Sequence, residues 1–124
     1  MADANAIVSV RNQTRGAVLA ESTVVANTSS KRRQGLLGRD TFEPGSGLWI
    51  VPCESVHSFG MRFPIDVVYL DRKRKVRKVR EHMIPGRISA DLLSHSVLEL
   101  PAGTIARTRT QPGDQLEIER LDPQ

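Results

Sequence analysis

Apolar and polar residues alternate along the chain in a pattern that predicts a succession of short strands. Residues 6–11 and 16–25 are rich in β-branched and small apolar residues, and turn formers at 12–16 separate them. This arrangement predicts a hairpin. The same reasoning predicts further strands at 47–51, 65–70, 75–81, 96–100 and 115–120. The strand at 75–81 follows 65–70 after a short turn, so we expect the two to pair antiparallel.

Two short helices are expected between these strands. A Thr or Ser within 28–30 can cap a helix of about two turns, with Leu36 and Leu37 at its buried end and Gly38 where it stops. A helical turn is expected after Pro101. Many short strands with one or two short helices predict a mainly β, single-domain fold over residues 1–124, either a sandwich or a partly open barrel.

The strand at 65–70, IDVVYL, contains an acid where an apolar residue is expected. Strand side chains alternate between two faces, so Asp66 shares one face with Val68 and Leu70. Both faces are otherwise apolar, which predicts that the strand is buried together with its carboxylate. A buried carboxylate without partners is costly, so Asp66 must be hydrogen-bonded, ion-paired or functional.

A second acid, Glu99, lies inside the apolar strand SVLEL at 96–100. Strands of a small sandwich can bring Glu99 and Asp66 within a few ångströms of each other. Two carboxylates in a poorly solvated site split their pKa values, and one can then serve as a general acid. The structural alternative is that each acid accepts backbone N–H groups and ties loops to strands.

The residues just before the buried strand form a candidate ligand site. His57 is expected on a loop, where it could act as a general base oriented by Asp66 or Glu99. Phe59, Met61 and Phe63 alternate and could form the apolar wall of a pocket, with the Ser58 hydroxyl as a polar contact. The structural alternative is that Phe59, Met61 and Phe63 are core residues and that His57 is a hydrogen-bonded residue at the rim of the barrel.

Charge is unevenly distributed. The net charge is +4, yet the segment 72–80 alone holds seven basic residues and no acid: Arg72, Lys73, Arg74, Lys75, Arg77, Lys78 and Arg80. Removing these seven from the 18 Lys and Arg leaves 11 basic residues against 14 acidic ones. A basic patch can bind nucleic acid or an acidic protein partner. It lacks aromatic stacking partners, however, and solvated charge also protects a sheet edge.

The single cysteine, Cys53, excludes an internal disulfide and is expected to be a small buried hydrophobe. Zinc sites need three or four protein ligands, so the pair Cys53 and His57 predicts no metal site, and no cofactor is indicated. No apolar run approaches the ~20 residues that span a bilayer, and the first residues lack a secretory signal pattern. We therefore expect a soluble cytoplasmic protein without membrane contact; its oligomeric state stays open.

Several motifs occur in a recognisable order: RQGLLGRD at 33–40, GLWIV at 47–51, HSFGMRFPIDVVYLD at 57–71, SVLELPAGT at 96–104 and PGD at 112–114. In these motifs the chain resembles the uncharacterised bacterial and archaeal family called domain of unknown function 192. The resemblance implies a jelly-roll-like β domain. It implies no reaction, because no biochemical role is established for the family.

Three functional hypotheses follow. The first is a small-ligand-binding or accessory domain with a pocket near residues 57–66. Its site residues would be His57, Ser58, Phe59, Met61, Phe63, Asp66 and Glu99. The second is a small hydrolase- or lyase-type enzyme that uses His57 with Asp66 or Glu99. The third is a module that binds nucleic acid or an acidic partner through residues 72–80.

Overall fold

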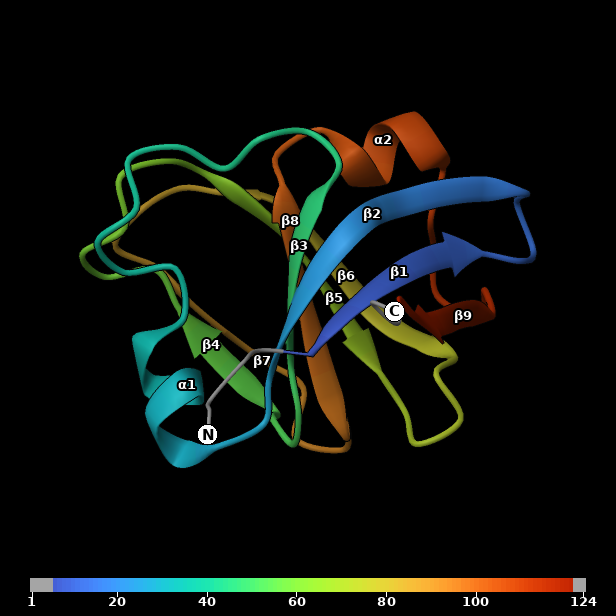
Figure 1. Cartoon of the computed structure of the whole chain (residues 1–124), viewed down its shortest axis with the longest axis horizontal. Helices are drawn as coiled ribbons and strands as arrows, with labels where there is room; N and C mark the ends of the chain where they lie inside the picture. The colour runs from blue at the N-terminus through green and yellow to red at the C-terminus, as the bar shows by residue number, and fades with distance from the viewer. Residues whose placement is uncertain (1–5, 122–124) are drawn as a thin grey trace.

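The strands of the computed structural model form one seven-stranded sheet and one two-stranded ribbon (Figure 1). The structure describes residues 6–121. The large sheet has the strand order β6-β5-β8-β3-β2-β1-β9, and the ribbon pairs β4 with β7. In chain order the elements are β1 (Ile7–Asn12), β2 (Ala17–Ala26), α1 (Ser29–Gln34), β3 (Ser46–Ile50), β4 (Ser55–His57), β5 (Ile65–Leu70), β6 (Val76–Met83), β7 (Ile88–Ala90), β8 (Ser96–Pro101), α2 (Thr104–Thr108) and β9 (Leu116–Arg120).

The large sheet curls into a half-barrel. Its neighbouring strands pair antiparallel except β2 with β3, which are parallel. At one end the two edges meet, because Lys75 and Gln115 form an isolated antiparallel bridge and the Val76 amide donates to the Asp114 carbonyl at 2.8 Å. The predicted mainly β fold in the form of a partly open barrel is therefore confirmed. The likeness to a jelly roll stays a prediction.

The sheet has two apolar faces, and each supports its own core. On the first, which we call the barrel face, β5 and β8 contribute Val68, Leu70, Leu98 and Leu100, and Ile105 of α2 packs against them. On the second, which we call the ribbon face, the apolar cluster includes Val67, Tyr69 and Val97 of β5 and β8, covered by Leu36 and Val56. Both strands are buried throughout, as the sequence predicts for β5.

The segment around α1 covers part of the ribbon face. Thr28 caps the helix, its hydroxyl accepting the Lys31 amide at 3.1 Å, as the sequence predicts. The helix ends earlier than predicted, because the chain adopts a positive φ of 50° at Gly35. No residue within α1 is buried, and Leu36, in the turn that follows, anchors the segment in the core.

The β4–β7 ribbon was not predicted from the sequence, since each strand is only three residues long. It crosses the same face as α1, and the two lie near each other in Figure 1. In its register Val56 pairs with Ser89 and His57 with Ile88, so Val56 points to the core and His57 points away. His57 therefore ends a strand, whereas a loop position was expected.

Basic side chains of β6 hold this ribbon. Lys78 and Arg80 pair in register with Tyr69 and Val67, so they project from the ribbon face. The Lys78 ammonium donates to the Ala90 carbonyl at 2.7 Å, and the Arg80 guanidinium donates to the Ile88 carbonyl at 3.3 Å. These bonds satisfy carbonyl groups of β7 that no neighbouring strand reaches, so the two side chains fix the ribbon to the sheet.

Replacing Lys78 with methionine is expected to loosen the ribbon by about 1 kcal/mol, because methionine keeps a long apolar side chain but removes both the hydrogen bond to Ala90 and the ammonium group over the Tyr69 ring. Amide hydrogen exchange of residues 88–90 should accelerate roughly fivefold for that energy, while exchange in β5 stays unchanged. The matched control is Lys75→Met, at an exposed lysine of the same basic segment. Equal exchange in both variants would contradict an anchoring role for Lys78.

Candidate functional site

Glu99 faces a cleft on the ribbon face. In the sheet register Glu99 pairs with Val67 of β5 and Leu48 of β3, both members of the core on that face. The cleft has a volume of about 360 Å³ and lies between the α1 segment, the residues after β3, and β4. It is lined by Ser29, Arg32, Arg33, Gln34, Gly35, Leu36, Leu37, Ile50, Pro52, Cys53, Ser55, Val56, His57, Met61 and Glu99.

The Glu99 carboxyl group lacks the partners that a buried acid normally has. The residue is only 2% exposed, and none of the described residues donates a hydrogen bond to its Oε1 atom. Loss of solvation raises the pKa of Glu99 from 4.5 to about 8. At neutral pH the side chain is therefore mostly a neutral carboxylic acid, which can both donate and accept a hydrogen bond.

The solvent end of the cleft is positively charged. Arg32 is half-buried and Arg33 is exposed, and both come from α1. Arginine is always charged in proteins and binds carboxylate and phosphate groups through paired hydrogen bonds. A single cleft thus combines a buried neutral acid, an apolar wall that includes Leu36 and Met61, and a cationic opening.

Cys53 lies between these groups. Burial is the largest cause that raises the pKa of its thiol; the nearby Glu99 carboxylate adds to the increase and the Arg32 charge opposes it. The thiol is half-buried, where a buried one was expected, and it donates to the Ser55 carbonyl at 3.1 Å. A raised pKa leaves little thiolate at neutral pH, so Cys53 is a wall residue and not an activated nucleophile.

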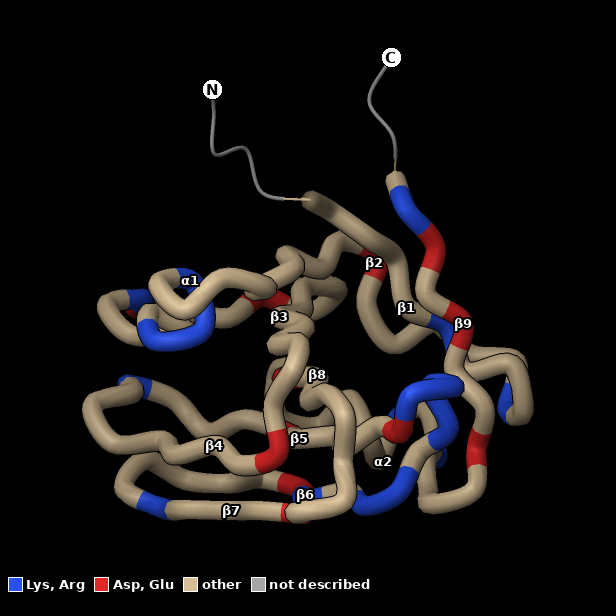
Figure 2. Tube along the Cα trace, turned by 90° about the horizontal axis from the view of Figure 1, so that it is seen from below, with Lys and Arg blue, Asp and Glu red and all other residues tan. Residues whose placement is uncertain are grey.

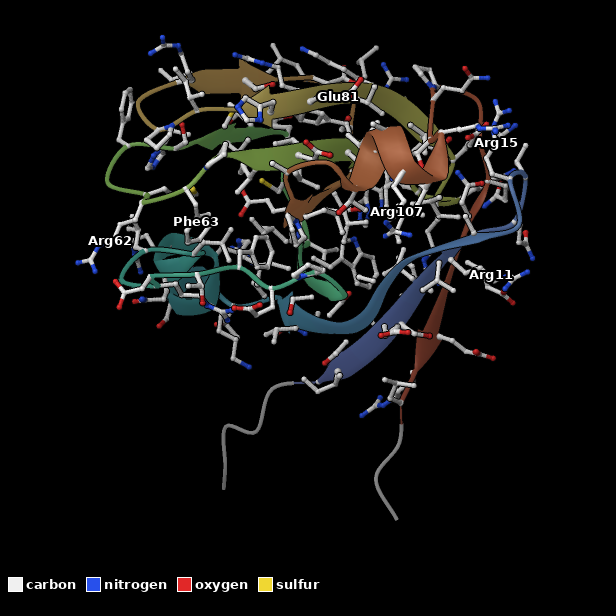
Figure 3. All side chains as sticks on the ribbon, turned by 90° about the horizontal axis from the view of Figure 1, so that it is seen from above. Arg11, Arg15, Arg62, Phe63, Glu81 and Arg107 are labelled. Carbon is white, nitrogen blue, oxygen red and sulfur yellow. The ribbon has the colours of Figure 1, made fainter. Side chains whose placement is uncertain are left out.

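Two further residues of the predicted site reach the cleft, and four, including Asp66, do not line it. His57 and Met61 line it together with Glu99. Ser58 is buried, donates to the Ile84 carbonyl at 2.7 Å and accepts the Arg87 amide at 2.9 Å, which makes it a tie between loops. The other two are aromatic: Phe59 is 49% exposed and stacks on the His57 ring, and Phe63 packs against Phe42. In Figure 3, Phe63 and its neighbour Arg62 point in different directions.

Asp66 lies on the barrel face, so the expectation that Asp66 and Glu99 share one site is wrong. Its register partner is Leu100, which belongs to the core of that face. Its Oδ1 accepts the His82 amide at 2.9 Å, and its Oδ2 accepts the amides of Gly103 and Ile105 at 3.1 and 2.8 Å. The carboxylate therefore ties β6 and the start of α2 to β5, which is the structural alternative given above.

This geometry changes the enzymatic hypothesis. Asp66 cannot orient His57, because the sheet separates them. Glu99 and His57 both line the cleft, and catalysis by that pair stays a prediction.

Most of the basic segment serves the fold. Besides Lys78 and Arg80, Arg77 forms an ion pair with Asp91 at 2.8 Å, and Arg74 lies over the Trp49 ring. The remaining basic residues, Arg72, Lys73 and Lys75, are exposed. Figure 2 shows how the Lys and Arg positions gather along this part of the chain and around α1.

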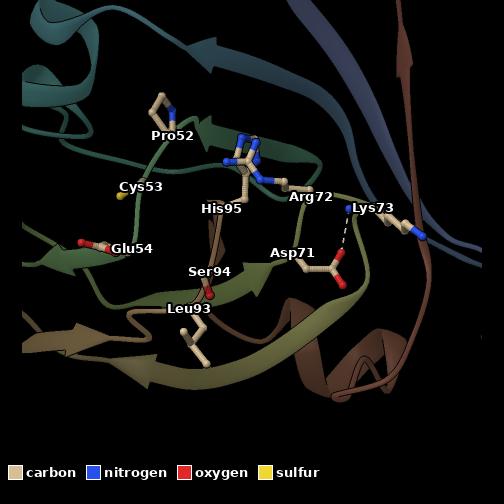
Figure 4. A pocket seen from close by; sticks show the side chains of 9 residues that line it. All are labelled: Pro52, Cys53, Glu54, Asp71, Arg72, Lys73, Leu93, Ser94 and His95. Carbon is tan, nitrogen blue, oxygen red and sulfur yellow. Dashed lines mark hydrogen bonds between the residues drawn. The ribbon is translucent and has the colours of Figure 1, made fainter.

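Arg72 and Lys73 line a second, wider cleft of about 660 Å³ (Figure 4). Pro52, Leu93 and His95 also line it. The turn beside it is fixed by Asp71, whose carboxylate accepts the Lys73 amide at 2.8 Å. In contrast to Glu99 in the first cleft, the side chains here are exposed or only half-buried.

The sequence model of one family, described as Uncharacterized ACR (domain of unknown function 192), matches residues 10–118. The chain belongs to this family. The match begins within β1 and ends within β9, so it covers most of the half-barrel. It also includes every residue that lines the Glu99 cleft. None of the curated proteins matches the chain.

Two solved structures are similar to this member of the ACR family. One, from Sinorhizobium meliloti, is described as a proposed transcription regulator; it is 26% identical, with a TM-score of 0.81 over 95% of this chain and 96% of that one. The other, a protein of unknown function from Novosphingobium aromaticivorans, is 21% identical, with a TM-score of 0.78 over 91% and 84%. Both likenesses support the fold.

Within residues 6–121, no three His, Cys, Asp or Glu side chains lie close enough together to hold a metal ion. In the same range, no helix has the length and apolar character needed to cross a membrane.

Proposed function

We propose that this ACR-family domain binds a small molecule in the Glu99 cleft. The observation that supports this most strongly is the Glu99 carboxyl group, which is buried and faces the cleft, and whose Oε1 has no hydrogen-bond partner among residues 6–121. Leaving a buried polar group unpaired costs free energy, typically about 1–3 kcal/mol. Groups of this kind concentrate at functional sites, because a ligand can supply the missing partner.

The size and lining of the cleft support this proposal. A volume of about 360 Å³ falls within the range of sites that hold small molecules. Such sites are mostly apolar with a few polar groups that fix the ligand's orientation, and here the apolar residues Leu36, Ile50, Val56 and Met61 line the same cleft as Glu99.

A thermal-shift screen of small metabolites tests the proposal. A ligand that binds only the folded state raises the melting temperature; at a hundredfold excess over its Kd the stabilisation is about 2.7 kcal/mol. Compounds that stabilise the native protein should lose their effect in Glu99→Leu, which removes the carboxyl group and keeps an apolar side chain. The matched control is Glu117→Gln, at an exposed acid on β9. Stabilisation that survives Glu99→Leu unchanged would place the ligand elsewhere.

A further inference from the structure

The charge and polarity of the cleft also define the ligand's chemical class. We infer that the cleft selects an amphipathic organic anion: its carboxylate or phosphate group pairs with Arg32 and Arg33, its apolar body lies along the wall, and a hydroxyl or carbonyl oxygen meets Glu99. This inference rests on the proposed ligand-binding function. It adds the orientation of the ligand and the sign of its charge.

Burial separates the two ends of the cleft. Glu99 is almost completely buried in the middle of β8, whereas Arg32 is half-buried and Arg33 exposed on α1. A ligand that reaches Glu99 therefore keeps its other end near the arginines. The residues between them are apolar or weakly polar, including Leu36, Val56 and Cys53.

The arginines are available to a ligand. Within residues 6–121, the salt bridges found involve Arg15, Arg62 and Arg77, and none of them involves Arg32 or Arg33. Arg32 is close enough to the cleft to act electrostatically on Cys53. Two guanidinium groups on one turn of helix attract an anion and repel a cation at the opening.

Glu99 also favours an anion or a neutral group over a cation. Its pKa is raised by desolvation, and no positive charge compensates it, so the neutral acid is the main form at pH 7. As an O–H donor it suits an acceptor oxygen of the ligand. Around it, the elements packed on the ribbon face contribute these titratable or charged groups: Arg32 and Arg33 of α1, Cys53 and Glu54 after β3, His57 of β4, Tyr69 of β5, and Lys78 and Arg80 of β6.

Among these neighbours, the acid Glu54 is exposed and does not line the cleft. Cys53 and Tyr69 both have raised pKa values, chiefly because of burial, and are neutral at pH 7. The side chains that line the cleft are thus neutral or positive at pH 7. Above about pH 8 the ionised Glu99 adds a negative charge, which weakens the binding of an anion.

The test compares four probes of equal chain length: octanoate, octyl phosphate, 8-hydroxyoctanoate and octylamine. Binding is followed by chemical shifts of the amides of residues 53–57 and 99. At pH 7 we expect the anions to bind at least tenfold more tightly than octylamine, and 8-hydroxyoctanoate most tightly among the carboxylates. The octanoate and octyl phosphate arms show which anionic group the arginines prefer.

Variants of the protein test which residues contact each end of the ligand. The double variant Arg32→Met, Arg33→Met should weaken the anions roughly fivefold to tenfold without affecting octylamine adversely. Glu99→Leu should remove the advantage of 8-hydroxyoctanoate over octanoate. In the native protein, this advantage should also decline between pH 7 and pH 9. Arg11→Met, at an exposed arginine of β1, is the matched control.

The outcomes separate the two proposals. Tightest binding of octylamine at the same amides would overturn the anion selectivity and leave ligand binding intact. Binding of the anions that the double variant does not weaken would overturn the role of the arginines. If no probe shifts the cleft amides at millimolar concentration, an amphipathic anion is not the ligand class; the metabolite screen with Glu99→Leu then decides the proposed function separately.

Discussion

Replacing Asp66 with asparagine is expected to lower the free energy of unfolding by about 3 kcal/mol or more. The carboxylate accepts three backbone amides, from His82, Gly103 and Ile105. An asparagine side chain presents one acceptor oxygen, and its NH₂ group would face amide donors. Whichever way the asparagine turns, either the His82 amide or the amides of Gly103 and Ile105 face its NH₂ group and lose their acceptor.

Thermal and urea denaturation measure this effect, and a decrease in Tm on the order of 10 °C is expected for that change in stability. The matched control is Asp40→Asn, which neutralises a largely exposed aspartate that forms a surface ion pair with Arg62. Exposed ion pairs contribute little, so this variant should change stability by less than about 1 kcal/mol. A small effect of Asp66→Asn, similar to that of the control, would contradict the structural role of Asp66.

The second large effect concerns pH and Glu99. The pKa of Glu99 is about 8 in the folded protein and 4.5 ordinarily, so the folded state holds its proton more tightly than the unfolded state does. Stability is therefore highest below pH 4.5 with respect to this group, and it falls as pH rises from 4.5 to 8. Above pH 8 both states are ionised and the loss is complete. Between pH 5 and pH 8 the expected loss is on the order of 3–4 kcal/mol.

Comparison with Glu99→Gln isolates this contribution. Glutamine has nearly the same shape and no charge, so the other titrating groups contribute equally to both proteins. The difference in unfolding free energy between the native protein and the variant should be small at pH 5 and should favour the variant by pH 8. A difference that does not change with pH would mean that Glu99 has an ordinary pKa in the folded state.

Much of the fold could be predicted from the sequence, because strand periodicity and turn residues are local signals. The strand 65–70 was predicted with its observed bounds, and the first hairpin, the capped start of α1 and the last strand were predicted to within one residue. The β4–β7 ribbon escaped prediction because three-residue strands have no measurable periodicity. The end of α1 was misplaced because the helix already stops at Gly35, although Gly38 also has a positive φ, of 84°.

The site was harder to predict, because it depends on which residues share a face of the sheet. Both acids could be recognised as buried from their apolar neighbours. Their separation, however, follows from the β5–β8 register, which places Glu99 opposite Val67 and Asp66 opposite Leu100. A shift of one residue would have put them on the same face. The sequence does not identify Arg32 and Arg33 as site residues, because nothing local indicates that α1 lies beside Glu99.

A measurement of the pKa of Glu99 in the folded protein tests the neutral, buried acid in the cleft most directly. In protein labelled with ¹³C at glutamate side chains, the Glu99 carboxyl resonance is assigned by its absence from Glu99→Gln and followed from pH 3 to pH 10. We expect a midpoint near pH 8, as for a buried acid whose Oε1 has no partner among the described residues. A midpoint near 4.5 would show an ionised, solvated carboxylate at neutral pH and would contradict the neutral acid in the cleft.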